Sequence, residues 1–221
     1  MLQVKMLLFG GTFDPPHNGH IALLKNCAEI VQPDEIRILP AGIPPHKSIK
    51  PASAEHRIAM CSIFCELLPN CTIDIRETER AGKSYTADTV RELREEYPNA
   101  ELYLCIGSDM FLSFEAWHEH EYLLKEATLV VHLRQTEDEE QVLLQQLKFA
   151  EAGAEIILIQ ENFIELSSSK IRELCTKEGN VKPFLPPFVY EYIQGHNLYQ
   201  EGERYRSDYS KRMREFGKSD T

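Results

Sequence analysis

Two histidines in a turn rich in glycine and proline are the side chains of this sequence best placed for chemistry. Residues 9–20 read FGGTFDPPHNGH and follow an apolar run typical of a buried strand. Gly10 and Gly11 carry no side chain, so the backbone amides there can approach an anion closely. His17 and His20 are spaced to share one face at the start of a helix, whose unpaired N–H groups and positive dipole end favour an anion at the same place. The spacing therefore predicts a phosphate site in which both imidazoles donate hydrogen bonds.

Two surface histidines after an ordinary proline turn are the alternative interpretation of this segment. The position of both histidines in a glycine-rich strand-to-helix turn favours the phosphate site. Two other phosphate-binding patterns do not fit. No Gly-x-Gly-x-x-Gly follows the first apolar run, and residues 42–48, GIPPHKS, lack the glycine that precedes the lysine of a Walker loop.

The elements that must position this turn alternate between short apolar runs and helical patterns. Strands are predicted at Lys5–Phe9, Glu35–Leu39, Cys71–Ile75, Glu101–Ile106, Thr128–His132 and Glu155–Ile159. One helix is predicted to begin near His17 or Asn18, with Ile21, Leu24, Ala28 and Val31 on one face, and others are predicted at Arg57–Leu68, Ala87–Glu96 and Glu139–Ala150. Such alternation predicts a parallel sheet with helices on both faces, so we expect a single-domain α/β fold, a Rossmann-like doubly wound sheet. Ligands of such sheets bind outside the carboxyl ends of the strands.

The composition limits the kinds of function. The chain has 221 residues, of which 43% are hydrophobic and 27% charged, as is typical of one globular domain. A net charge of −11 argues against binding a nucleic-acid backbone but not against a small anionic ligand. No apolar run reaches the roughly 20 residues that cross a bilayer, and the apolar start leads directly into the turn, which favours a core strand over a signal peptide. We expect a cytoplasmic protein that binds neither membranes nor nucleic acid.

The six cysteines show no Cys-x-x-Cys pair, and several lie within apolar stretches. We therefore expect reduced, buried thiols. A zinc site or a set of disulfides is the alternative.

The end of the chain differs from the rest. Residues 201–221 are polar and nearly balanced in charge, so we place the domain at residues 1–200 and a tail after it. Four apolar residues in the tail fall at helical spacing: Tyr205, Tyr209, Met213 and Phe216. A frayed end and a short docked helix are the two alternatives.

The motif at residues 9–20 resembles that of a known enzyme family. Residues 9–20 resemble the His-x-Gly-His signature of the nucleotidylyltransferase superfamily, and the form GGTFDPPH is similar to the bacterial nicotinate-nucleotide adenylyltransferase family. That family makes nicotinate adenine dinucleotide and pyrophosphate from ATP and nicotinate mononucleotide, with Mg²⁺. The resemblance, which extends over roughly residues 5–198, implies these two small-molecule partners and that cofactor. It also implies that the turn binds ATP through Gly10, Gly11, Thr12 and Phe13.

Two further segments match this family. Residues 44–47, PPHK, follow the second predicted strand, and Lys47 offers a point charge for phosphates; an exposed loop lysine is the alternative. Residues 84–89, SYTADT, open a predicted helix, which Thr86 is expected to cap. The resemblance implies that Thr86 also helps to hold the carboxylate of nicotinate.

The segment after the fourth predicted strand is suited to a nucleotide. Residues 106–111 read IGSDMF, where Gly107 lets a nucleotide lie against the strand end and Asp109 can accept hydrogen bonds from ribose hydroxyls. Trp117 is the only tryptophan and offers a flat surface for a pyridine, although alone it would be interpreted as a core residue. The next residue, His118, departs from the aromatic residue that the family often carries. The resemblance implies that His118 contacts the acceptor through its backbone amide.

The last matching segment is LSSSKIR, residues 166–172, similar to the family's Ile-Ser-Ser-Thr-x-Ile-Arg. Its predicted phosphate-binding hydroxyls belong to Ser167, Ser168 and Ser169. Arg172 is expected in the first turn of the following helix, where a cation opposes the helix dipole at a cost of about 0.3–1 kcal/mol. A bound phosphate would offset this cost, and a salt bridge to Glu173 is a partial alternative.

The resemblance implies an adenylyltransferase, and the chemistry of such a transfer requires only positioning. The acceptor phosphate is already a nucleophile, so the enzyme must align it with the α-phosphorus and neutralise the charge of the departing pyrophosphate. The expected catalytic set is His17, His20, Lys47 and Arg172, helped by Ser168. No residues are predicted as metal ligands, since the triphosphate supplies most ligands of Mg²⁺. The alternatives are nicotinamide mononucleotide as acceptor, a phosphopantetheine adenylyltransferase, and a non-catalytic nucleotide sensor; the oligomeric state is not indicated.

Overall fold

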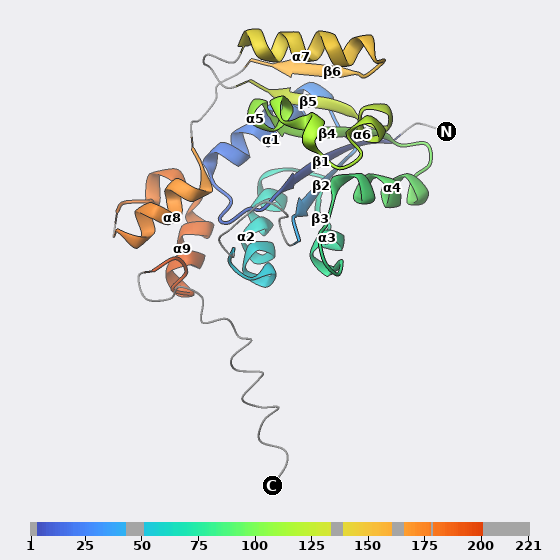
Figure 1. The fold of residues 1–221 in the computed structure, drawn as a ribbon. Coiled ribbons are helices and arrows are strands. Elements are labelled where there is room, and N and C mark those ends of the chain that lie inside the picture. The colour runs from blue at the N-terminus through green and yellow to red at the C-terminus, as the bar shows by residue number, and fades with distance from the viewer. Residues whose placement is uncertain (1–3, 43–50, 134–138, 161–165, 178, 201–221) are drawn as a thin grey trace.

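Parallel strands form a single sheet at the centre of the protein (Figure 1). The computed structural model describes residues 4–42, 51–133, 139–160, 166–177 and 179–200. Within these ranges the six strands are β1 (Lys5–Gly11), β2 (Glu35–Pro40), β3 (Cys71–Ile73), β4 (Glu101–Gly107), β5 (Thr128–His132) and β6 (Ile156–Ile159). They pair in the order β3-β2-β1-β4-β5-β6, and each pair is parallel. The predicted doubly wound α/β fold is confirmed, and each predicted strand is present with its ends shifted by at most two residues.

Helices connect the strands and cover both faces of the sheet. The described helices are α1 (Asn18–Val31), α2 (Ala54–Leu67), α3 (Arg76–Glu79), α4 (Thr86–Glu96), α5 (Ser108–Leu112), α6 (His120–Glu126), α7 (Glu139–Glu151), α8 (Ser168–Thr176) and α9 (Pro187–Gly195), with 3₁₀ turns η1 (Phe114–Ala116) and η2 (Lys182–Phe184). The four helices predicted from periodicity are α1, α2, α4 and α7. Helix α2 begins three residues earlier than predicted, because Ser53 caps it by accepting the His56 N–H.

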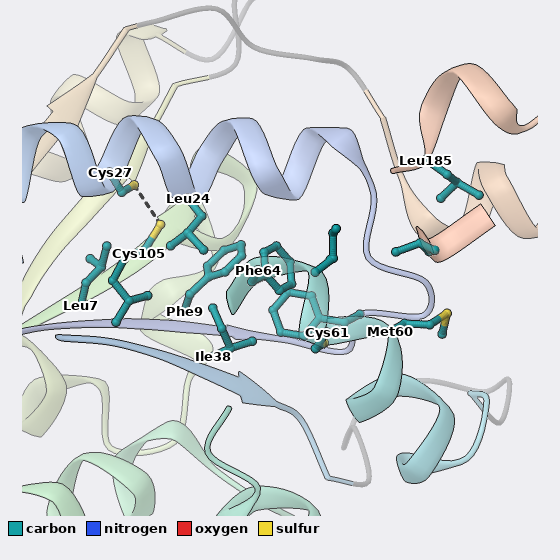
Figure 2. Close-up of a cluster of buried hydrophobic side chains, with 14 of the residues drawn as sticks. Leu7, Phe9, Leu24, Cys27, Ile38, Met60, Cys61, Phe64, Cys105 and Leu185 are labelled. Carbon is teal, nitrogen blue, oxygen red and sulfur yellow. Dashed lines mark hydrogen bonds between the residues drawn. The ribbon is translucent and has the colours of Figure 1, made fainter. Parts of the chain in front are cut away.

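The two faces of the sheet carry separate hydrophobic cores. Along β1, Leu7 and Phe9 point to one core, whereas Met6 and Leu8 point to the other. The first core is completed by α1, α2, α8 and α9, and the second by α4 to α7. Figure 2 shows the first core, with Leu24 of α1 packed over β1. Burial on both faces explains why the central strands β1, β4 and β5 read as largely apolar runs.

The direction in which strands are added reverses between β1 and β4. Strands β2 and β3 extend the sheet on one side of β1, and β4 to β6 extend it on the other. Such a reversal opens a crevice at the carboxyl ends of the two central strands, where doubly wound folds bind ligands. Gly11 and Gly107 end these two strands. Helix α9 lies next to α2, and α8 and α9 both lie near the end of the sheet where β1 passes into α1 (Figure 1).

All six cysteines are free thiols in the structure, and Cys27, Cys61 and Cys105 are buried. Burial raises the pKa of the Cys61 and Cys105 thiols. Cys105 of β4 donates a hydrogen bond to Cys27 of α1 at 2.8 Å (Figure 2). No helix in the described ranges combines the length and apolar character that a membrane crossing requires.

Replacement of Phe64 by alanine tests the first core. The Phe64 side chain is 0% exposed, and its ring centroid lies 5.7 Å from that of Phe9 and 5.3 Å from that of Phe13. We expect Phe64→Ala to lower the free energy of unfolding by about 3–5 kcal/mol in urea titrations, because it removes buried apolar surface and leaves a cavity. Leu144, which is 61% exposed, is the control, and Leu144→Ala should change stability by less than about 0.5 kcal/mol. Equal losses for both variants would contradict the core assignment.

Candidate active site

A reciprocal pair of histidine caps starts helix α1. His17 is the N-cap residue, and its Nδ1 accepts the His20 backbone N–H at 3.4 Å. In return, the His20 Nδ1 accepts the His17 N–H at 3.2 Å, and the two ring centroids are 3.7 Å apart. This capping box confirms the predicted helix start and shows how the backbone fixes both rings.

The capping box also determines which ring nitrogen carries the proton. A neutral imidazole has one N–H and one acceptor nitrogen. Because Nδ1 of both His17 and His20 accepts a backbone N–H, the neutral rings carry their protons on Nε2. Each neutral ring therefore carries an Nε2–H, a group that can donate a hydrogen bond.

Phe13 supports the turn from behind. It is buried, with φ of 49°, an uncommon conformation for a bulky side chain. Its ring lies 5.3 Å from that of His20, and a Cβ on Gly11 would lie 2.9 Å from the Phe13 ring. The Phe13 side chain thus belongs to the core, and only its backbone is placed to meet a nucleotide. A Cβ on the exposed Gly10 would meet no described atom within 4 Å, so packing does not dictate this glycine.

The carboxylate of Asp14 joins three segments that are distant in sequence. Asp14 is 3% exposed, and its Oδ1 accepts the Ala52 N–H at 3.0 Å and the Tyr199 hydroxyl at 2.8 Å. Its Oδ2 lies 3.4 Å from Nη1 of Arg172. Sequence reasoning missed Asp14 and Tyr199, because no local pattern reports contacts across 158 and 185 residues.

Arg57 is a second buried charge at the turn that sequence reasoning missed. Its Nη1 donates to the Thr12 carbonyl at 2.8 Å and its Nε to the Ala52 carbonyl at 3.1 Å. Burial lowers the pKa of Arg57, and the nearby Asp14 carboxylate opposes this shift. One signal was present in the sequence: Arg57 shares a helix face with the apolar Phe64, where an unpaired charge would be unexpected.

Helix α8 brings the last motif to the turn. Ser167 caps the helix by accepting the Lys170 N–H at 3.2 Å, and Ser168 donates its hydroxyl to the Pro15 carbonyl at 2.9 Å. Arg172 Nη1 donates to the Asp14 carbonyl at 2.7 Å, and its Nη2 donates to Ser169 Oγ at 3.1 Å. The structure therefore places all four predicted residues of this motif beside the turn or at the helix start that faces it.

One expectation about Arg172 was wrong. It is the fifth residue of α8, which begins at Ser168, and so lies just beyond the first turn. The dipole effect falls off within the first turn, so the cost of the cation there is smaller than expected.

The acceptor residues come from two neighbouring segments. Thr86 is the first residue of α4, whereas Tyr85 is its N-cap and makes no side-chain capping bond, so the predicted capping by Thr86 was wrong. The Tyr85 ring lies 4.4 Å from the His118 ring at an interplanar angle of 35°. Trp117 packs against Phe114 with ring centroids 5.0 Å apart. Contact between Tyr85 and His118 thus brings the threonine and tryptophan segments together.

The end of β4 is shaped by one glycine. Gly107 precedes α5, and a Cβ on it would lie 2.7 Å from Oδ1 of Asp109. The absence of this Cβ lets the exposed Asp109 carboxylate fold back toward the strand end. Because β4 pairs with β1, the predicted ribose acceptor lies one strand away from the histidine turn.

A buried polar network supports the start of α4. Thr89 donates to Oε1 of Glu77 at 2.9 Å, and burial raises the pKa of Glu77 while this hydrogen bond opposes the rise. Arg80 donates to Ser84 Oγ at 2.5 Å. A Cβ on Gly42 would lie 2.2 Å from the Glu77 carbonyl oxygen, so the segment after β2 packs directly on this network. These contacts were not predicted.

Two of the expectations concern residues on which the structure gives no information. Lys47 and its PPHK segment lie outside the described residues, as does the tail at residues 201–221. Among the described residues, no group of three or more histidines, cysteines, aspartates and glutamates is arranged to hold a metal ion.

Comparison with known proteins identifies the family. The sequence pattern described as Cytidylyltransferase-like matches residues 8–174. A probable nicotinate-nucleotide adenylyltransferase of Gemmatimonas aurantiaca is 33% identical over 205 residues, which cover 93% of this chain and 97% of that protein. One of Bacillus pumilus is 36% identical over 197 residues, with 89% and 98% covered. The chain belongs to the nicotinate-nucleotide adenylyltransferase family.

Solved structures agree with this assignment at the level of the fold. A nicotinic acid mononucleotide adenylyltransferase of Plasmodium falciparum, solved in complex with NaAD, superposes with a TM-score of 0.73 at 24% identity, covering 89% of this chain and 98% of that one. A putative nicotinate-nucleotide adenylyltransferase of Vibrio parahaemolyticus gives a TM-score of 0.64 at 18% identity, covering 90% and 97%. The sheet and its helices are therefore those of the nucleotidylyltransferase fold.

The histidine caps predict a specific tautomer, which NMR can measure. Two-dimensional ¹⁵N–¹H spectra of the imidazoles at pH 8 should show His17 and His20 protonated on Nε2, because each Nδ1 accepts a backbone N–H. In His17→Asn the backbone N–H of residue 17 remains, so the His20 signal should keep the same tautomer. An Nδ1-protonated form at either ring of the unmodified protein would contradict the capping box.

Proposed function

We propose that this chain transfers AMP from ATP to nicotinate mononucleotide, giving nicotinate adenine dinucleotide and pyrophosphate. The observation that carries the proposal is the contact of α8 with the histidine turn, through Arg172 and Ser168, in a chain of this family. It joins two predicted phosphate-binding motifs that are 153 to 158 residues apart. The names of the relatives and the NaAD complex of the Plasmodium falciparum protein support the choice of acceptor.

The turn and α8 would hold the triphosphate. His17 and His20 offer Nε2–H donors, and the glycine backbone offers amides. Arg172 offers a cation at the Asp14 carbonyl of the same turn. Lys47 would add a further charge from the segment after β2. The acceptor phosphate attacks the α-phosphorus, its new P–O bond replaces the bond to the β-phosphate oxygen, and pyrophosphate leaves with the bonding electrons. Donors that stabilise the departing charge accelerate this step without a general base.

The ends of β4 and α4 would hold the two nucleosides. Asp109 is placed to accept hydrogen bonds from the ribose of ATP beside Gly107. Trp117 and His118 lie next to the start of α4, where Thr86 and the helix amides suit a carboxylate. The nicotinate ring would stack on the Trp117 ring, which itself packs against Phe114.

Magnesium would enter with ATP. The described residues contain no three-ligand cluster, so the protein provides no metal cage of its own there and the triphosphate and water would be the ligands. The ion would neutralise phosphate charge when bound, and the protein groups above orient the same phosphates. We further propose that the catalytic unit is residues 1–200 and that the protein acts in the cytoplasm.

The acceptor can be identified by pyrophosphate release with paired substrates. We expect faster release with nicotinate mononucleotide than with nicotinamide mononucleotide, because the amide removes the charge that the α4 amides favour. Trp117→Ala should raise the KM for nicotinate mononucleotide by about 10-fold, through loss of stacking, and leave the KM for ATP nearly unchanged. Faster pyrophosphate release with nicotinamide mononucleotide would show that the proposed acceptor is wrong. Tight ATP binding with no release from either acceptor would instead indicate a nucleotide sensor.

Replacement of His20 tests the phosphate site. We expect His20→Ala to lower kcat about 100-fold or more through loss of an Nε2–H donor to the triphosphate. The lost capping bond should cost only about 1 kcal/mol in unfolding free energy, so the variant remains folded. Lys148→Ala is the control, because Lys148 is an exposed cation paired with Glu115, far from the turn in sequence. Undiminished turnover by folded His20→Ala would refute the assignment.

A further inference from the structure

The buried carboxylate of Asp14 is the point at which Arg172 and the segment after α9 meet the phosphate-binding turn. Its Oδ1 accepts from Tyr199 at 2.8 Å and from Ala52 at 3.0 Å, while Arg172 approaches its Oδ2 at 3.4 Å. We propose that Asp14 and Tyr199 are positioning residues for ATP: they hold the Arg172 guanidinium in place before the triphosphate binds. This inference rests on the proposed phosphate site and adds two residues, Asp14 and Tyr199, to which the sequence motifs assigned no role.

Several groups of the protein fix the position of the Arg172 guanidinium. Nη1 donates to the Asp14 carbonyl at 2.7 Å and lies near its carboxylate, and Nη2 donates to Ser169 at 3.1 Å. The Arg172 side chain is only 17% exposed. An arginine side chain loses considerable rotamer freedom when it is fixed. If the protein fixes it during folding, ATP binding does not bear that cost, and affinity for ATP is higher.

Asp14 orients Arg172 without cancelling the positive charge of the turn. Arg57 also interacts electrostatically with the Asp14 carboxylate, and its guanidinium donates to the Thr12 carbonyl. Two guanidinium groups thus act on the Asp14 carboxylate, and the other carboxylate that acts on Arg57, that of Glu55, has a weaker effect than Asp14. An anion at this place is therefore still attracted, while the direction of Arg172 is fixed.

Tyr199 fixes the position of the carboxylate itself. Its φ of 66° is in the left-handed region, and nearby Asn197 has φ of 51°. Such conformations cost energy in residues other than glycine and persist where surrounding contacts hold them. The Tyr199 ring packs on the first core, and its hydroxyl donates to Asp14. The segment after α9 is thus directed to the turn, where it holds one carboxylate oxygen and leaves the other facing Arg172.

The test is Tyr199→Phe, which removes the hydroxyl and keeps the ring. We expect the Kd and the KM for ATP to rise about fivefold, as for loss of one hydrogen bond, while the KM for nicotinate mononucleotide stays within about twofold. Tyr192→Phe is the matched control. The Tyr192 hydroxyl bonds to His56 at 3.0 Å and so joins α9 to α2 without touching Asp14 or Arg172. Its ATP affinity should stay within about twofold of the unmodified protein.

A double-mutant cycle separates positioning from general stability. In an Arg172→Ala background, Tyr199→Phe should have almost no further effect on the Kd for ATP, because the residue through which it acts is gone. Asp14→Asn should weaken ATP binding more than Tyr199→Phe, because it removes the charge that orients Arg172. Unchanged ATP affinity in Tyr199→Phe, an equal rise in the KM for both substrates, or full additivity with Arg172→Ala would overturn the inference.

Direct ATP binding keeps this inference separate from the proposed function. If the unmodified protein releases no pyrophosphate with any acceptor, the proposed reaction fails, yet the Kd for ATP still tests Tyr199. If pyrophosphate is released but Tyr199→Phe binds ATP normally, the reaction stands and only the positioning role fails. Thermal unfolding of each variant verifies that it is folded at the assay temperature.

Discussion

The turn between β1 and α1 is held by hydrogen bonds from segments that are distant in the sequence. Its carbonyl groups have left the strand ladder and have not yet entered the helix, so regular structure cannot satisfy all of them. Arg57 of α2 donates to the Thr12 carbonyl, and Arg172 of α8 donates to the Asp14 carbonyl. The positions of α2 and α8 therefore depend on this turn. The hydrogen bonds that attach α2 and α8 to the turn also place the cations of Arg57 and Arg172 at the turn that carries the two histidines.

The sheet was predictable because the physics of its strands is local. The central strands β1, β4 and β5 are largely buried on both faces, which requires apolar runs, and each of the six predicted strands matched a strand of the described sheet. The four longest described helices were predictable from local patterns too. Short elements such as α5, with five residues, and α6, with seven, carry too few turns for periodicity to show. Helix α9 is rich in aromatic and β-branched residues, which favour strands locally; packing against α2 outweighs this preference.

Residues of the proposed site could be predicted where they lie together in a short sequence motif. They could not be predicted where folding brings distant segments together. The histidine turn could be proposed because spacing and residue type limit what it can do, whereas Trp117 could be proposed only beside the other motifs of the family. Thr86 shows the limit of this reasoning: a threonine at a helix start suggests a cap, but the helix begins one residue too early for it. The partners of Asp14 lie up to 185 residues away, so only the tertiary structure reveals them. Arg57 is an intermediate case. Its position on an apolar helix face indicates that its charge is paired, but the sequence does not show with which groups.

The charge of the chain and the chemistry of its site are compatible because they act over different distances. A net charge of −11 repels a long polyanion, which would meet much of the surface. A small triphosphate meets only the turn, and salt screens charges beyond about 8–10 Å. At the turn the donors are the Nε2–H groups of the two imidazoles and backbone amides, together with Arg57 and Arg172 near the buried Asp14 carboxylate. The proposed site would attract an anion locally without a basic surface, so the acidic composition is compatible with a small phosphorylated ligand and disfavours a nucleic acid.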